Sequence, residues 1–358
     1  MSSSEVILAS AGLDNTICTW SLPSITRHRS FACTKGPIGC LDLSLDAKYL
    51  SVGACLQLHI FDRNASPGNV TPAFVLHEGG HVSAVSCIGH FNTPRLMLYT
   101  AGDDCGVRIW DAGARQASMQ TTLPTSIHHG IPLSPQRSLS SMLFAGDDGA
   151  LYHWSIETNS VSKAFAFPST TAIPSDLPPR NPPSCTKLAI CHETNIIAVG
   201  LADGNVALFK LPYSGSLPDE WLGPHILTTS SSFVTSLNIS SFPTEQGSIL
   251  LTVAGINGQV SFYKVVPTSL DSESCDLFSF SQLRMFNSQT LDPVLDSTLT
   301  NDGEHLFAAS LDGRVYWYRV LNEEGDVKPY LFYDRIRHSD SDSKGICSLS
   351  MRDVVRKW

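Results

Sequence analysis

Three side chains of the sequence, those of His81, Thr100 and Asp104, are of the types that together carry out acyl transfer: a general base, a hydroxyl nucleophile and a carboxylate. The same types also form purely structural networks, because a buried carboxylate needs hydrogen-bond donors and imidazole and hydroxyl groups supply them. The segment around these residues recurs along the chain. This repetition favours the structural interpretation over a catalytic triad.

Other groups that could do chemistry are also better explained without catalysis. The acidic pairs at 103–104 and 147–148 fall at expected hairpin turns, where Asp is favoured for local hydrogen bonding. The histidine pair at 128–129 is interpreted as part of a loop or the start of a strand, and not as a metal site. The sequence has no G-x-S-x-G, G-x-x-x-x-G-K-[S/T] or H-E-x-x-H motif. We therefore predict no enzymatic activity, with no catalytic residue, metal or cofactor.

Ten cysteines are scattered along the chain, and none of them forms a C-x-x-C pair. A zinc site needs ligands that cluster at short spacing, and a secreted disulfide framework usually accompanies a signal peptide. The opening residues, Met-Ser-Ser-Ser-Glu, have neither the basic nor the apolar region of such a peptide. We therefore expect reduced, buried cysteines and a cytoplasmic protein.

Composition narrows the class of protein further. Apolar residues make up 42% of the 358 residues and charged residues 16%, which is typical of a globular chain. The formal net charge is -9 and no long run of Lys or Arg occurs, so a nucleic-acid partner is not expected. No stretch of about 18 apolar residues is present, so membrane insertion is not expected either.

One sequence phrase recurs seven times. It consists of small or apolar residues, a turn that contains Gly, Asp or Asn, and a short alternating strand that ends in an aromatic residue, as in LYTAGDDCGVRIW. The seven copies end at Trp20, Phe61, Trp110, Trp154, Phe209, Tyr263 and Trp317. The aromatic residues of successive copies are therefore 41 to 55 residues apart. A repeat of this length is typical of propellers and other repeat architectures.

Each copy predicts a β-hairpin, because turn residues with positive φ are flanked by β-branched and aromatic residues. A third alternating strand precedes most copies, at 38–45, 82–89, 234–241 and 294–300. A fourth follows the aromatic residue, for example at 161–167. Four strands per repeat make a propeller blade. No segment keeps helical apolar spacing for three turns, so the fold class is all-β, with seven blades.

The two chain ends are expected to share one blade. The first copy begins too near residue 1 to leave room for the strand that should precede it, and the segment at 345–351 has the alternation of an innermost strand. Pairing the two ends would close the ring and remove an open sheet edge. We therefore predict a single domain over 1–358, in which the C-terminal strand completes the first blade.

The repeated phrase resembles the WD repeat, in which a small residue and an Asp-containing turn lead to Trp-Asp, with Gly-His upstream. The third copy is the most complete, with His81, Thr100, Asp104 and Trp110. The resemblance implies that these four side chains form a hydrogen-bonded network that holds the blade together. Other copies keep part of the set, namely Ser10, Asp14, Trp20, Asp148, Trp154, Asp203 and Asp312.

A finer resemblance exists to one branch of this family. VILASAGLDNTICTW in the first copy, HIFD at the end of the second and YTAGDDCGVRIWD in the third are similar to the G-protein-β-like small propeller subunit of TOR kinase complexes. The resemblance implies a non-catalytic scaffold that binds and stabilises the kinase domain in nutrient and growth signalling. The alternative is a generic WD-repeat adaptor, such as a ubiquitin-ligase substrate receptor or a subunit of a trafficking complex.

The sequence departs from this branch at two places. The branch has a Trp-x-Trp pair that leads into the first strand of the penultimate blade, and the matching residues here are Pro293, Val294 and Leu295. A Pro-rich insertion at 173–183 is interpreted as a solvated spacer, with docking to a proline-binding domain as the alternative.

A Gly- and Pro-rich insertion at 211–224 supplies the candidate partner contacts. It contains Tyr213 and Trp221, and exposed aromatic residues often anchor protein interfaces. The alternative is that both side chains pack against the outer strands of their blade.

Overall fold

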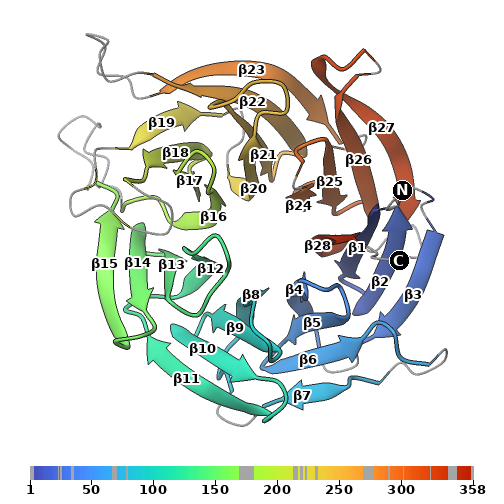
Figure 1. Ribbon diagram of the computed structural model, residues 1–358, viewed down its shortest axis with the longest axis vertical. Coiled ribbons are helices and arrows are strands. Elements are labelled where there is room, and N and C mark those ends of the chain that lie inside the picture. The colour runs from blue at the N-terminus through green and yellow to red at the C-terminus, as the bar shows by residue number, and fades with distance from the viewer. Residues whose placement is uncertain are drawn as a thin grey trace.

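The computed structural model is a ring of seven four-stranded antiparallel sheets, the blades of a β-propeller (Figure 1). The structure describes residues 4–22, 24, 26–33, 36–66, 71–77, 80–168, 181–212, 217, 221, 224–229, 233–268, 278–288, 291–300, 302–322, 324–337 and 345–355. Every element within these ranges is a strand, which confirms the predicted all-β class and the seven blades. No helix that could cross a membrane occurs in this part of the chain.

The strands form four concentric layers around a central channel. The innermost strands are β28 (Ile346–Val355), β4 (Ile38–Leu43), β8 (Val85–His90), β12 (Ile127–Pro132), β16 (Cys185–Cys191), β20 (Val234–Ser241) and β24 (Val294–Leu299). The second strands are β1 (Ser4–Gly12), β5 (Tyr49–Ala54), β9 (Met97–Gly102), β13 (Ser141–Gly146), β17 (Ile196–Leu201), β21 (Ile249–Gly255) and β25 (His305–Ser310). The third strands are β2 (Thr16–Leu22), β6 (Gln57–Asp62), β10 (Gly106–Asp111), β14 (Ala150–Ser155), β18 (Asn205–Lys210), β22 (Gln259–Pro267) and β26 (Arg314–Leu321). The outer strands are β3 (Thr26–Ala32), β7 (Phe74–Leu76), β11 (Gln116–Thr122), β15 (Ser160–Ala166), β19 (His225–Thr228), β23 (Phe278–Asn287) and β27 (Val327–Arg337).

The two chain ends share blade 1, as predicted. Its strand order is β28-β1-β2-β3, and blades 2 to 7 follow in chain order, each with four consecutive strands. The closing strand β28 pairs antiparallel with β1, from Ser4 opposite Val355 to Gly12 opposite Ile346. It is longer than the segment expected at 345–351. Figure 1 shows both ends of the chain beside this blade.

Packing between blades forms the core. Seven hydrophobic clusters of buried residues occur, and each joins two neighbouring blades. The aromatic residues that end the repeated phrase belong to these clusters. Trp110, for example, packs between blades 2 and 3, and Trp154 between blades 3 and 4. Because both faces of the inner strands are covered by neighbours, each blade depends on the two beside it.

The seventh copy is shifted by one residue from the predicted register. Trp317 was expected at the repeated aromatic position, but it is paired with Phe307 and faces blade 1. Tyr318 occupies the repeated position, because it is paired with Leu306 and packs between blades 6 and 7, as Tyr263 does between blades 5 and 6. The run Tyr-Trp-Tyr offers an aromatic residue to both faces of β26, so sequence alone does not settle the register.

The turns between second and third strands share one backbone feature. Each contains a residue with left-handed φ, at Asn15, Cys55, Cys105, Gly149, Gly204, Gly258 and Gly313. Three of these are not glycine, and Cys rarely adopts this conformation. In blade 3 the amide of Gly106 donates to Asp104 Oδ1 at 3.0 Å, so the Asp at the preceding position stabilises the turn.

Antiparallel order within every blade divides the connections between two faces. One face, here named the turn face, holds the turns between second and third strands and the connections that lead into the next blade. The other, the loop face, holds the connections from first to second and from third to outer strands. The innermost strands of all seven blades line the channel that joins the two faces.

Candidate functional site

The four residues expected to form a network in blade 3 lie within hydrogen-bonding distance of one another. The indole Nε1 of Trp110 donates to Thr100 Oγ1 at 2.8 Å, and His81 Nε2 lies 2.7 Å from the same oxygen. The other imidazole nitrogen, His81 Nδ1, lies 2.8 Å from Asp104 Oδ1. The Arg108 guanidinium adds an ion pair to the carboxylate, at 3.2 Å. This chain of contacts joins two strands, β9 and β10, and the turn between them to the connection that leads into the blade.

The environment fixes the charge state of this network. Burial lowers the pKa of His81, and the nearby positive charge of Arg108 lowers it further, so the ring is neutral at pH 7. Burial opposes ionisation of Asp104, but hydrogen bonds from His81 and from the Val82 amide outweigh it and lower the pKa to about 2. A neutral imidazole can donate from Nδ1 to the Asp104 carboxylate and accept at Nε2 from the Thr100 hydroxyl, which is one proton arrangement that satisfies all three side chains.

Removing the hydroxyl at the centre of this network is expected to destabilise the protein. In Thr100→Val, Trp110 Nε1 and His81 Nε2 lose their shared partner while the shape of the side chain is kept, so we expect a loss of about 1–3 kcal/mol in the free energy of unfolding. Thr252→Val is the matched control, because Thr252 is buried and its hydroxyl has no hydrogen-bond partner in the described structure. Urea unfolding of both variants is the measurement. Equal effects would show that Thr100 contributes through packing alone.

The partial sets in other blades are less connected. In blade 1, Trp20 Nε1 donates to Ser10 Oγ at 3.2 Å, and Asp14 accepts from the amide and the hydroxyl of Thr16 within the turn. In blade 4, Trp154 Nε1 donates to Asn159 Oδ1 at 3.1 Å.

The remaining turn aspartates act locally. Asp148 accepts from the Ala150 amide and from the Tyr152 hydroxyl, and Asp312 accepts from the corresponding groups of Arg314 and Tyr316. Within the described residues, Asp203 accepts from the amide and the side chain of Asn205. In blades 4 and 7 a Tyr four residues after the Asp thus donates to the carboxylate, at the position that Arg108 occupies in blade 3.

Of the two candidate partner contacts, only Trp221 lies in the described part of the chain. Its ring is half-buried and packs on Phe209, with centroids 4.7 Å apart, and on Phe165, at 5.8 Å. This packing is close to the alternative considered for Trp221, because Phe165 is on the outer strand β15 and Phe209 is on the third strand β18. Trp221 stays a candidate partner contact. Tyr213 lies outside the described residues, as does most of the Pro-rich insertion at 173–183.

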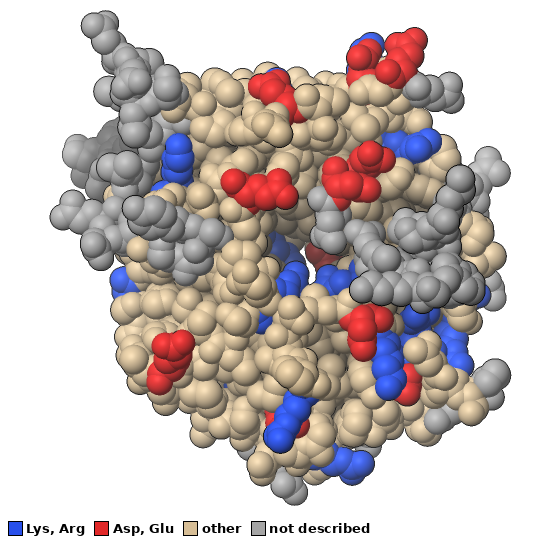
Figure 2. Space-filling view, viewed as in Figure 1, with Lys and Arg blue, Asp and Glu red and all other residues tan. Residues whose placement is uncertain are grey.

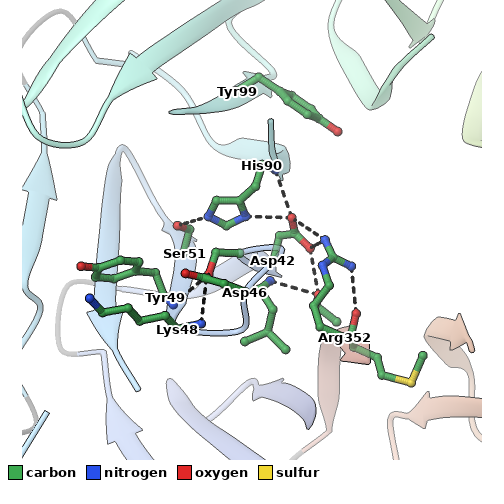
Figure 3. Close-up of polar contacts among 12 residues, drawn as sticks. Asp42, Asp46, Lys48, Tyr49, Ser51, His90, Tyr99 and Arg352 are labelled. Carbon is green, nitrogen blue, oxygen red and sulfur yellow. Dashed lines mark hydrogen bonds and ion pairs between the residues drawn. The ribbon is translucent and has the colours of Figure 1, made fainter. Parts of the chain in front are cut away.

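A second polar cluster, centred on Asp42, was missed by the sequence analysis. Asp42 on β4 accepts from the amide and from Nδ1 of His90 on β8, at 3.1 and 2.9 Å (Figure 3). It also accepts from the hydroxyl of Ser350 at 2.8 Å and from Nη2 of Arg352 at 2.9 and 3.1 Å, both on β28. His90 Nε2 lies 3.0 Å from Ser51 Oγ. Asp42, Ser51, His90, Ser350 and Arg352 are named the Asp42 cluster.

The Asp42 cluster links three blades where the ring closes. Burial opposes ionisation of Asp42, but Arg352 and the hydrogen bond from His90 outweigh it and hold the pKa of the carboxyl well below its usual range. On the other side of β28, Asp296 of β24 accepts from the Leu349 amide at 2.9 Å and from the Ser348 hydroxyl at 3.2 Å. Two carboxylates from neighbouring blades therefore hold the closing strand from both sides.

Ser51, His90 and Asp42 are in the order of a catalytic triad, but their surroundings do not suit nucleophilic catalysis. Ser51 is completely buried and His90 is 1% exposed, so a substrate has no path to the hydroxyl in this conformation. Their contacts satisfy buried polar groups, which is a structural role. Among the described residues, no group of three or more His, Cys, Asp or Glu side chains is placed to hold a metal ion.

The exposed apolar side chains gather on one face. Seven large ones lie in the connections of the turn face, at Leu13, Leu56, Val82, Phe233, Ile256, Leu291 and Leu311. They belong to blades 6, 7, 1, 2 and 3, which are consecutive around the ring, and are named the apolar arc. The other four exposed large apolar residues of the described chain lie on outer strands, at Ile226, Met285, Leu331 and Phe332. Exposed apolar patches often mark interaction surfaces, so the apolar arc is a candidate for one.

Comparison with known sequences supports the relationship suggested by the repeats. A model of the WD domain, G-beta repeat, matches residues 72–111. The target of rapamycin complex subunit LST8 of Bos taurus is 23% identical over 219 residues, which cover 61% of this chain and 60% of the relative. The LST8 homolog of Dictyostelium discoideum is 33% identical over 109 residues, 30% of this chain and 34% of the relative. The chain thus spans about three-fifths or less of the curated relatives it matches.

Solved structures agree with the fold. The structure of U3-55K superposes with a TM-score of 0.61 at 15% identity and covers 95% of this chain and 91% of its own. The propeller domain of Swd1 from Myceliophteria thermophila superposes with a TM-score of 0.60 at 12% identity, covering 84% of this chain and 87% of its own. The repeats, the seven blades and these similarities identify the chain as a WD-repeat β-propeller that is homologous, over part of their length, to the LST8 subunits of target of rapamycin complexes.

Proposed function

We propose that this protein is a scaffold subunit that binds the kinase domain of a TOR-type kinase and stabilises its active arrangement. Two facts support the proposal: the similarity to proteins named as target of rapamycin complex subunits, and a fold that serves protein–protein interaction. A rigid ring presents many loops in fixed positions, so little conformational entropy is lost when a partner binds. The scaffold would favour the active kinase conformation by binding it more tightly than the inactive one.

The observation that carries the proposal is the apolar arc, and Leu291 is its most informative member. This side chain is 63% exposed, and its backbone has a left-handed φ of 58°, which is unfavourable for leucine. Such strain persists only where the surroundings hold it, and it often marks a functional position. The following segment is tied to the next turn, because the Leu311 amide donates to the Pro293 carbonyl at 2.9 Å. Leu291 and Leu311 are therefore two exposed apolar side chains on connected turn-face segments of blade 7, and they are named the apolar pair.

This pair lies beside the positions where the TOR-complex branch has its two tryptophans. Val294 is fully buried and packs between blades 6 and 7, so it offers nothing to a partner. Pro293 and Leu295 are half-buried. In the proposed complex, the aliphatic side chains of Leu291 and Leu311 make the apolar contact in place of aromatic anchors.

Replacing the apolar pair should weaken capture of the kinase. In Leu291→Asp/Leu311→Asp, two charges would be buried against an apolar partner surface, so we expect recovery of the kinase to fall at least about 10-fold. Asp adopts a left-handed φ more readily than Leu, so the fold should tolerate the change at 291. Affinity purification of the tagged protein from its own cells, followed by mass spectrometry, measures the effect.

Met285→Asp is the matched control, since Met285 is 42% exposed but lies within the outer strand β23 on the rim of the ring, and not in a connection of the turn face. It should leave recovery unchanged. If the wild-type protein recovers no TOR-type kinase, or recovers ubiquitin-ligase or trafficking subunits instead, the proposal is wrong and the generic adaptor role is favoured. Equal loss with Met285→Asp would mean that the kinase uses a different surface.

A further inference from the structure

The central channel is a polar cavity whose lining has more cationic than anionic side chains. It has a volume of about 490 Å³ and is lined by the inner strands of all seven blades. Three cationic side chains line it, those of Arg137, Lys187 and Arg352, together with the carboxylates of Asp42 and Asp296. Figure 2 looks down the ring and shows Lys and Arg at the channel wall. The lining is thus net positive in a chain whose net charge is -9.

The excess positive charge resides on Arg137. Arg352 is paired with Asp42 at 2.9 Å, and Lys187 lies 3.8 Å from Asp296. Burial and the charge of Lys187 lower the pKa of His129 to about 3, so this channel histidine is neutral at pH 7. Arg137 has no ion-pair partner in the described part of the chain. Its guanidinium is therefore available to a ligand.

The backbone holds Arg137 in place. The residue lies in the loop between β12 and β13 and has a left-handed φ of 52°, a conformation that costs energy for a side chain of this type. Two hydrogen bonds fix it, from the Arg137 amide to the Ser134 carbonyl at 2.9 Å and from the Asn92 amide to the Arg137 carbonyl at 3.0 Å. The backbone that carries the guanidinium is thus fixed in the loop.

Two further nitrogen atoms of the same cavity are buried without a hydrogen-bond partner in the described structure. They are Nε of Arg352 and Nδ1 of His192. Burial lowers the pKa of His192, and the charge of Arg137 lowers it further. Buried polar atoms are usually hydrogen-bonded, and both of these line the cavity, where a ligand could supply the partner. Arg137, Arg352 and His192 thus line the same cavity, and all three lie towards the loop-face end of the channel.

We propose that this end of the channel binds the phosphoryl group of a small molecule, with Arg137 as the principal ligand and Arg352 Nε and His192 as further donors. A planar guanidinium matches the oxygen geometry of a phosphate and binds it through two parallel hydrogen bonds. The cavity volume is within the range of small-molecule sites. The site is on the channel and not on the apolar arc, so the proposal is independent of the kinase interaction.

Pyrophosphate is a suitable probe, used with the full chain in isothermal titration calorimetry. We expect saturable 1:1 binding by the wild-type protein and a loss of at least about 10-fold in affinity in Arg137→Gln. Arg137→Lys should keep part of the affinity, because it keeps the positive charge but loses the two parallel hydrogen bonds of the guanidinium. Arg95→Gln is the matched control: Arg95 is on the same face, its side chain is 83% exposed, and it pairs with Asp111. This variant should bind as the wild type does.

Several outcomes would overturn the proposal. They are no binding of pyrophosphate at millimolar concentration, undiminished affinity in Arg137→Gln, or an equal loss in Arg95→Gln, which would indicate a general charge effect. Binding of an acidic peptide but not of pyrophosphate would assign the channel to a protein tail instead. Thermal unfolding of each variant, expected to match the wild type, separates loss of binding from loss of fold.

Discussion

Deleting residues 344–358 should destabilise the entire ring and not only blade 1. The deletion removes β28, and with it the backbone pairing to β1 and the buried side chains of Ile346, Leu349 and Met351. Each such side chain contributes about 1.5–3 kcal/mol when buried, and whole domains are stable by only about 5–15 kcal/mol. We therefore expect the midpoint of thermal unfolding to fall by more than about 10 °C, or cooperative unfolding to disappear.

A synthetic peptide of residues 344–358 provides the control for this experiment. If the truncated ring lacks only its closing strand, the peptide should restore part of the lost unfolding temperature when added in trans. Differential scanning calorimetry of the truncated protein, with and without the peptide, makes the comparison. A truncated protein that unfolds at the wild-type temperature would show that the other six blades and β1–β3 are stable without closure.

The architecture was predictable from the sequence because its signals repeat. Seven copies of a turn flanked by alternating strands leave few alternatives, and an error in one copy is corrected by the others. The misassigned aromatic of the seventh copy shows the limit of this approach. Trp317 and Tyr318 are adjacent aromatic residues, and only the pairing with Phe307 and Leu306 decides which one faces blade 6.

The polar sites were predictable only where they follow the repeat. His81, Thr100, Asp104 and Trp110 occupy fixed positions within one copy, so their contact could be inferred from a pattern. Asp42 gave one local signal, a carboxylate within an alternating strand, LDL. Its partner Arg352 is 310 positions away in the chain, and the ring closure that joins them depends on every blade between. No local pattern specifies such a pair.

Loss of the Asp42 carboxylate is expected to have the largest effect of any single substitution discussed. In Asp42→Asn the charge of Arg352 is left buried without its counter-ion, and His90 and Ser350 lose a strong acceptor. Breaking a buried pair by removing one partner costs about 3–5 kcal/mol. Asp46→Asn is the matched control, because Asp46 is exposed in the following turn and the amide oxygen can still accept from Ser44. Its cost should stay below about 1 kcal/mol.

The same cluster predicts a dependence of stability on pH. The pKa of Asp42 is lower in the folded protein than the value of about 4 that it has in the unfolded chain, so the unfolded state binds the proton more readily. The stabilisation is therefore complete above pH 4 and is lost as the pH falls below it. Urea unfolding between pH 7 and pH 3 should show a smaller acid-induced loss of the free energy of unfolding in Asp42→Asn than in the wild type.

A double-mutant cycle that combines Asp42→Asn with Arg352→Met measures the coupling energy of this ion pair. A coupling energy near zero would mean that Asp42 and Arg352 do not hold the closing strand together.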